Sequence, residues 1–377
     1  MQICTRKNII YSSFISSLSS LIAGINITSI NLLHKPFILC QETSGLFPYC
    51  IQCSDSKWAA IVASLFFGAP FSCMIFNSKY PKNILLLANQ LYLIGTALLL
   101  SGMNYPIVLI GRFIIGMAVG ISSSYASVYI SLVAPPSSMA VLGSLPGVFI
   151  STGCLVGEIL TYYIKNWRVG YFILFAFILL HTVFLFTIET VEQNEEIDNS
   201  DRSYNNPLLT AVLLHIFQQL SCINGILQYS GKILEKNPNA KLISIGFISI
   251  MVICNVISIF IVRKFKRKSL LITSIIISII GLLLLTLDFN FLISVTIFIS
   301  GFSIGLGPIP WLILSEIFQN KDKSKYSKIA VSFNWISGCA VSFAFPLLFN
   351  KFGTFTFLYH SGLMGIFLCY VCLFFNM

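Results

Sequence analysis

Long apolar runs recur from one end of this 377-residue chain to the other. A helix needs about 20 apolar residues to cross roughly 30 Å of hydrocarbon, so runs of this length predict membrane-spanning helices. Charged residues make up only 10% of the chain, against roughly 25% in an ordinary soluble domain, which excludes a water-soluble fold. Continuous runs also exclude a membrane barrel, whose strands alternate over about ten residues. The chain is predicted to be an all-α, polytopic membrane protein.

Counting the runs predicts twelve spans. They fall at about residues 9–33, 55–76, 84–102, 106–131, 141–164, 168–189, 207–232, 240–263, 269–288, 291–315, 328–349 and 354–376. The first run continues past signal-peptide length without a small-residue cleavage site, so we expect a span and not a removed leader. Most Lys and Arg residues lie in loops on the side of the N-terminus, which predicts that both termini are cytoplasmic, with the plasma membrane as the expected location. The net charge of +10 then belongs to loops facing anionic lipid, and no nucleic-acid partner is expected.

The chain shows a coarse internal repeat. Lysines follow spans two and eight, and Lys268 comes 186 residues after Lys82; Pro135 and Lys321, after spans four and ten, have the same separation. Transporters are commonly built from such repeats. We therefore expect a six-helix bundle over residues 1–189, a short acidic cytoplasmic linker over residues 190–206, and a second six-helix bundle over residues 207–377, functioning as a monomer.

Cysteines supply no clear metal site. Cys40, Cys50 and Cys53 share the first outer loop, where one disulfide is feasible in an oxidising compartment. A zinc site formed with His34 is a weaker alternative because the spacing is irregular. We expect no metal and no cofactor.

Span seven carries amides at membrane depth, in the stretch HIFQQLSCINGILQYSG. An unsatisfied polar group in hydrocarbon costs several kcal/mol, so these side chains either join helices or line water. At 100° per residue one face holds Gln218, Ser221, Asn224 and Gln228. Gln219 falls off this face if the helix is straight, and Gly225 predicts a break. Amide side chains both donate and accept hydrogen bonds, as binding of an uncharged solute rich in hydroxyl groups requires. The polar face therefore predicts a binding cavity.

Span ten contains GLGPIPWLILSEIF, residues 305–318. Pro308 and Pro310 lack backbone donors, so the helix should bend or open at mid-depth. Trp311 follows directly and could form an apolar wall for a sugar ring, with Trp335 in span eleven as a second candidate. The alternative for both tryptophans is packing or interfacial anchoring.

Span four contains GRFIIGMAVG, residues 111–120. The spacing of Gly116 and Gly120 predicts close contact with another helix. Arg112 lies near the outer end of the span, where it could reach the interface along its aliphatic stem or serve a function.

These stretches together resemble the sugar porters, the branch of the major facilitator superfamily that includes the facilitative glucose transporters. FQQLSCIN resembles the family's QQLSGIN, GLGPIPWLILSEIF resembles GPGPIPWFIVAELF, and GRFIIGMAVG matches the family's span-four motif. Asn334-Trp335 follows Glu316 by 18 residues, as in the family. The likeness runs in order along nearly the whole chain. It implies the major facilitator fold, a central sugar site and alternating access.

The resemblance also implies roles for single residues. Gln218, Gln219 and Asn224 match sugar-binding positions, and Trp311 and Trp335 match aromatic walls. The expected substrate-binding set also includes Asn334, Gln228 and Asn26. Glu316 matches a gate carboxylate, which we expect to pair with the basic loop that holds Arg263, Arg267 and Lys268; Arg112, Pro308 and Pro310 complete the expected gating set. Asn26 stands where proton-coupled members have Asp, which favours uniport.

Several positions depart from the family pattern. Gly147, Met251, Ser303 and Gly338 stand where relatives usually have Gln, Asn, Glu and Asn, and Leu132 and Met139 replace the gate Glu and Arg after span four. Substrate identity and gating are therefore left open, while transport of a sugar-class solute remains the leading hypothesis.

Three alternatives stand beside facilitative uniport of a hexose. One is a proton-coupled sugar symporter, for which His181, His215, Glu158 and Arg112 are the intramembrane candidates. A lone histidine in a span is more often a satisfied hydrogen-bond partner. Another is a sugar sensor that binds without transport. An enzyme is disfavoured because no span shows paired carboxylates or a nucleophile beside a base.

Overall fold

The computed structural model describes residues 6–30, 53–102, 104–164, 166–193, 206–227, 238–318 and 320–375. The helices of the first part are α1 (Arg6–Thr28), α2 (Asp55–Ile75), α3 (Pro81–Ser101), α4 (Tyr105–Val133), α5 (Pro136–Leu142), α6 (Leu145–Tyr163) and α7 (Trp167–Thr187). Those of the second part are α8 (Pro207–Leu220), α10 (Ala240–Lys264), α11 (Arg267–Thr286), α12 (Phe291–Ile304), α13 (Ile309–Glu316), α14 (Asn320–Phe352) and α15 (Phe355–Phe374).

Helices long and apolar enough to cross a membrane follow the predicted spans. Eleven such stretches occur in the described residues, and α2 adds a shorter apolar stretch, Ala60–Ile75. Spans five and ten are each made of two helices in sequence, α5 with α6 and α12 with α13. The all-α, multi-pass fold is therefore confirmed.

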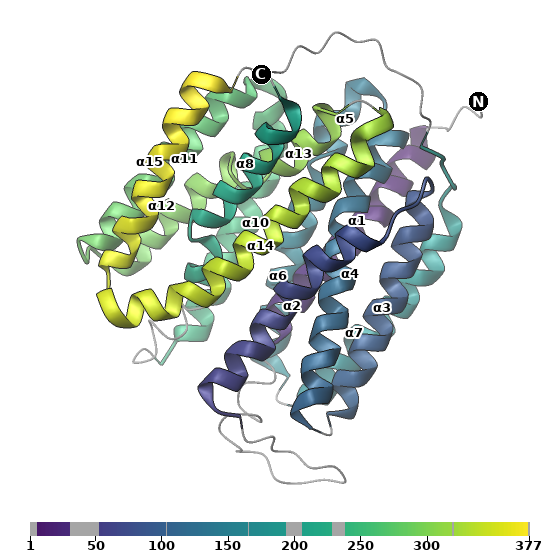
Figure 1. Cartoon of the computed structure of the whole chain (residues 1–377), viewed down its shortest axis with the longest axis horizontal. Helices are drawn as coiled ribbons and strands as arrows, with labels where there is room; N and C mark the ends of the chain where they lie inside the picture. The colour runs from purple at the N-terminus through teal and green to yellow at the C-terminus, as the bar shows by residue number, and fades with distance from the viewer. Residues whose placement is uncertain are drawn as a thin grey trace.

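The helices pack in two groups, shown in Figure 1. Helices α1 to α7 contact one another mainly through the pairs α1–α6, α2–α4 and α3–α4, and we call them the first bundle. Helices α8 to α15, the second bundle, pack through α11–α12, α11–α15 and α8–α14. Contacts between the bundles run from α2 to α14, from α6 to α10, and from α4 to α13 and α14. Of the expected linker, residues 194–205 lie outside the described residues.

Glycines allow the close contacts inside the first bundle. A Cβ atom on Gly116 would lie 2.1 Å from the carbonyl oxygen of Leu65, and one on Gly120 would lie 2.1 Å from that of Ala69. These distances are far below van der Waals contact, so α4 can approach α2 only because neither position carries a side chain. The close approach predicted from the spacing in span four is confirmed.

The two lysines on which the predicted repeat rests make similar contacts. Lys82, at the start of α3, donates from Nζ to the carbonyl oxygens of Phe186 and Ile188 at the end of α7, at 3.1 and 2.6 Å. Lys268, at the start of α11, donates to the carbonyl oxygen of Cys372 at the end of α15, at 2.9 Å. A cation at the C-terminus of a helix satisfies free carbonyls and interacts well with the helix dipole. We call the end of the molecule that carries these lysines the basic end.

Candidate functional site

The helix of span ten opens at mid-depth, as its glycines and prolines predict. α12 ends at Ile304 and α13 begins at Ile309. In a continuous helix the amide of residue 310 would donate to the carbonyl of Leu306, but Pro310 has no amide hydrogen. Gln218 of α8 supplies the missing donor: its Nε2 lies 2.8 Å from the carbonyl oxygen of Leu306 and 2.9 Å from that of Gly307.

Span seven is also interrupted, but three residues before the predicted position. α8 ends at Leu220, Cys222 has a positive φ of 77°, and the helix resumes at residues 223–227. Gly225 itself is helical, and its missing side chain makes room for Phe345, because a Cβ there would lie 2.7 Å from that ring. Asn224, which follows the interruption, donates back to Gln219, which precedes it. Gln219, which falls off the polar face only if the helix is straight, is part of the polar cluster as its expected site role requires.

Four amide side chains form one hydrogen-bonded cluster between span seven and α14. Asn334 donates from Nδ2 to Gln218 Oε1 at 2.8 Å and to the carbonyl oxygen of His215 at 3.2 Å. Gln219 Nε2 donates to Asn334 Oδ1 at 2.8 Å, and Asn224 Nδ2 donates to Gln219 Oε1 at 2.5 Å. We call Gln218, Gln219, Asn224 and Asn334 the amide cluster.

The members of the amide cluster differ in what they can still bind. Both N–H groups of Gln218 and both of Asn334 are used within the protein, and these side chains are only 4% and 1% exposed. Asn224 is partly exposed, and among the described residues its Oδ1 has no hydrogen-bond partner. Gln219 also retains one N–H. Fewer amides are therefore available to a solute than the sequence suggested. Gln218 and Asn334 stabilise the site, while Asn224 and Gln219 can still hydrogen-bond to a solute.

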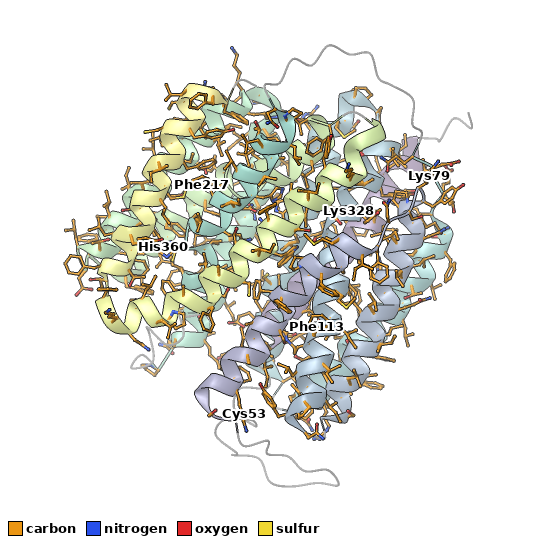
Figure 2. All side chains as sticks on the ribbon, in the orientation of Figure 1. Cys53, Lys79, Phe113, Phe217, Lys328 and His360 are labelled. Atoms are coloured by element: carbon orange, nitrogen blue, oxygen red, sulfur yellow. The ribbon has the colours of Figure 1, made fainter. Side chains whose placement is uncertain are left out.

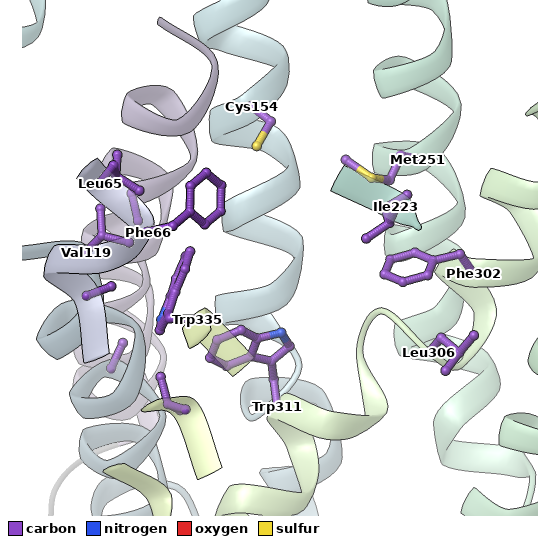
Figure 3. Close-up of a cluster of buried hydrophobic side chains, with 14 of the residues drawn as sticks. Leu65, Phe66, Val119, Cys154, Ile223, Met251, Phe302, Leu306, Trp311 and Trp335 are labelled. Atoms are coloured by element: carbon purple, nitrogen blue, oxygen red, sulfur yellow. The ribbon is translucent and has the colours of Figure 1, made fainter. Parts of the chain in front are cut away.

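The two tryptophans come from different helices and have different surroundings, as Figure 3 shows. Trp335 of α14 packs on Phe66 of α2, with ring centroids 5.9 Å apart, and its Nε1 lies 3.4 Å from Ser123 Oγ of α4. It is thus a contact between the two bundles. Trp311 of α13 packs edge-on against His215, at 5.1 Å, and its Cδ1 is 3.9 Å from a Cβ built on Gly147 of α6. Trp311 is the better candidate for a wall of the site.

Arg112 is buried, so the alternative in which it reaches the membrane interface is wrong. Its side chain has no measurable exposure, and Nη1 donates to the carbonyl oxygen of Asn26 at 2.8 Å. Asn26 is equally buried and donates its own Nδ2 to the carbonyl of Ile22. Among the described residues no carboxylate pairs with Arg112. His181, another candidate for proton coupling, is satisfied by Asn89 and by the carbonyl of Ile15.

The expected gate pair forms between Glu316 and Arg267. Arg267 Nη2 lies 2.9 Å from Glu316 Oε1, and its Nε lies 3.4 Å from Oε2. Lys268 instead binds the end of α15, and Arg263 is exposed without a described contact to Glu316. Since α11 and α13 both belong to the second bundle, this ion pair does not by itself connect the bundles.

Several residues of the expected binding, disulfide and zinc sites lie outside the part of the chain that the structure describes. Gln228, His34, Cys40 and Cys50 are not described, so the cavity role of Gln228, the disulfide and the zinc site stay predictions. Cys53 is described and buried, and its pKa is raised by that burial, with Lys57 opposing the shift. No cluster of metal-ligating side chains occurs in the described residues. Isolated polar residues in apolar runs also join the bundles, although no local pattern marks them: Asn255 Nδ2 donates to Ser151 Oγ at 3.0 Å.

Comparison with known proteins agrees with this architecture. The profile of the family described as "Sugar (and other) transporter" matches residues 12–191 and again residues 189–376. The chain belongs to the sugar transporter family. It is 26% identical to the glucose transporter GlcP of Staphylococcus epidermidis, over 88% of this chain and 84% of that protein. It is 24% identical to the facilitated glucose transporter member 3 of Canis lupus familiaris, over 96% and 88%.

Solved structures show the fold of this sugar transporter family member to be that of the major facilitator superfamily. The proton:xylose symporter XylE bound to 6-bromo-6-deoxy-D-glucose superposes with a TM-score of 0.84 at 21% identity, over 98% of this chain and 96% of that chain. FucP in its outward conformation gives a TM-score of 0.72 at 16% identity, over 99% and 100%.

Proposed function

We propose that this protein moves a hexose, or a similar polyol, across a membrane by alternating access, and that it works as a facilitative uniporter. The observation that carries the proposal is the junction of two interrupted spans, where Asn224 and Gln219 keep free hydrogen-bonding capacity. The same cluster binds the carbonyl of His215 through Asn334, and Trp311 packs against the His215 ring. Discontinuous helices at the repeat interface are where transporters bind their substrates. The names of the relatives, which include glucose transporters, support a sugar as the substrate.

The geometry supports separate roles for the residues that bind the solute and for those that position them. Asn224 offers a free acceptor and a free donor, and Gln219 a free donor, which suits sugar hydroxyl groups that both donate and accept. Trp311 provides an apolar face for the C–H side of a sugar ring. Gln218 and Asn334 fix the positions of these groups because their own hydrogen bonds are satisfied within the protein.

Uniport is supported by the buried pair of Arg112 and Asn26. Coupling to protons requires a group that takes up and releases a proton during transport, and an amide cannot do so. Here Arg112 is held by a backbone carbonyl, and among the described residues no carboxylate lies beside it. Proton symport is the competing hypothesis, since XylE and FucP are described as proton symporters.

In this proposal the first and second bundles rock about the amide cluster, the basic end faces the cytoplasm, and the protein acts in the plasma membrane as a monomer. The excess of positive charge at the basic end supports this orientation.

The proposal is tested by counterflow of labelled hexose in proteoliposomes, with unlabelled hexoses, pentoses and polyols as competitors. We expect accumulation that one group of competitors suppresses, with no change when a proton gradient is imposed. Binding without counterflow would indicate a sensor. Counterflow that persists while net uptake requires a proton gradient would replace uniport by symport.

A further inference from the structure

One cation bridges the two bundles at the basic end. Lys328 of α14, labelled in Figure 2, donates from Nζ to the carbonyl oxygen of Phe76 at 3.3 Å and to Asn77 Oδ1 at 3.0 Å. Phe76 is the C-terminal cap of α2. The contact therefore joins the second bundle to the end of a helix in the first.

The acceptors of Lys328 are fixed by neighbours within the first bundle. Tyr125 of α4 donates its hydroxyl to the same Asn77 Oδ1 at 3.3 Å, and the backbone N–H of Ser78 donates to the Tyr125 hydroxyl at 3.3 Å. Asn77 is thus held in place by α4 and by its own loop, so Lys328 meets preorganised oxygens. We call Lys328, Phe76, Asn77 and Tyr125 the α2–α14 node.

The node uses neutral acceptors. Among the described residues no carboxylate contacts Lys328, and both partners are uncharged oxygens. The carbonyl at the end of α2 carries partial negative charge from the helix dipole, which favours a cation there. Hydrogen bonds that involve a charged donor are stronger than neutral ones. The ion pair of Arg267 with Glu316, by contrast, lies wholly within the second bundle.

We propose that Lys328 is a gating residue: its contacts with Phe76 and Asn77 hold the bundles together at the basic end and must break each time that end opens. The inference rests on the proposed rocking of two bundles. Its test does not measure transport, so either idea can fail without the other.

Cys73 provides a built-in reporter of opening. It is fully buried on α2, one turn from the node, and its thiol is within hydrogen-bonding reach of Ser332 of α14 and Ser124 of α4. Separation of α14 from α2 would expose it. Cys222 is equally buried but lies in span seven, away from the node, and serves as the reference.

The experiment measures the rate at which a membrane-permeant maleimide modifies each cysteine in the full chain in proteoliposomes, read by mass spectrometry. Lys328→Met keeps the length of the side chain and removes the donor, and we expect Cys73 to react roughly tenfold faster, equal to about 1.4 kcal/mol. Lys328→Arg should stay close to wild type. The matched control is Lys325→Met, because Lys325 is exposed one turn earlier on α14, with its Nζ 5.9 Å from the centroid of the Tyr326 ring.

Asn77→Asp tests the same contact in the opposite direction. A charged acceptor should tighten the node and slow the reaction of Cys73, and this slowing should vanish when Lys328→Met is also present. An unchanged Cys73 rate in Lys328→Met, with Cys222 still protected, overturns the proposal. If Lys328→Met loosens the whole fold, Cys222 will also react, and the Asn77→Asp variant then decides between the outcomes. Slower modification of Cys73 in Asn77→Asp supports the gating role of Lys328, and an unchanged Cys73 rate rejects it.

Discussion

Substitution of Asn334 tests whether the buried amides position the site or contact the solute. In Asn334→Leu the side chain keeps a similar branched shape but loses three hydrogen bonds, with His215, Gln218 and Gln219. Because Asn334 is 1% exposed, water cannot readily replace it. Each buried group left unsatisfied costs about 1–3 kcal/mol, so a loss of roughly 2–5 kcal/mol in stability is expected after relaxation.

Asn224→Leu is the matched comparison. It removes one hydrogen bond inside the protein, to Gln219, from a partly exposed side chain, so stability should change little. If Asn224 contacts the solute, the affinity for hexose should fall by about 1–3 kcal/mol, roughly 5- to 150-fold. Thermal unfolding of the purified protein, with and without hexose, measures both quantities. The reasoning is refuted if Asn334→Leu leaves the unfolding temperature unchanged, or if Asn224→Leu lowers the unfolding temperature without affecting binding.

Three further outcomes are expected. Gly116→Ala forces α4 away from α2 and should cost about 1–3 kcal/mol in thermal stability, whereas Gly365→Ala, with no atom within 4 Å of the added Cβ, should not; equal stability of the two variants would contradict the close packing. Glu316→Gln removes the ion pair and should slow hexose uptake, and unchanged transport in both directions would exclude a gating role. Wild-type uptake should not depend on external pH, while Asn26→Asp, which puts a carboxylate on the residue whose backbone carbonyl binds Arg112, should introduce such dependence; strong pH dependence in the wild type would instead favour symport.

The amide cluster illustrates how far sequence could reach into the site. The number of amides in span seven indicated a polar face, and the two prolines of span ten indicated an opening at mid-depth. The sequence could not show that an amide of span seven hydrogen-bonds to the backbone carbonyl exposed by the opening in span ten. Pro310 leaves the carbonyl of Leu306 without a donor, and Gln218, from a helix 88 residues earlier, provides one. A residue expected to bind sugar is therefore occupied in completing the backbone of another span.

Of the proposed gating contacts, one could be expected from the sequence and the other could not. The resemblance of Glu316 to the family's gate carboxylate predicts pairing with the basic loop of Arg263, Arg267 and Lys268, and the structure pairs it with Arg267. In the sequence, Lys328 is one of many basic residues on the side of the N-terminus. Nothing local distinguishes it from Lys325, because its role depends on the passage of α14 beside the end of α2.

The sequence by itself determined the fold class, the course of the spans and the presence of interruptions in spans seven and ten. These follow from local physics: apolar length sets membrane crossing, glycine permits close contact, and proline removes a donor. The tertiary structure decided which polar groups remain free, because hydrogen-bonding capacity at membrane depth depends on which neighbours have already used it. It also decided which cation joins the bundles, since that depends on how two distant helices cross.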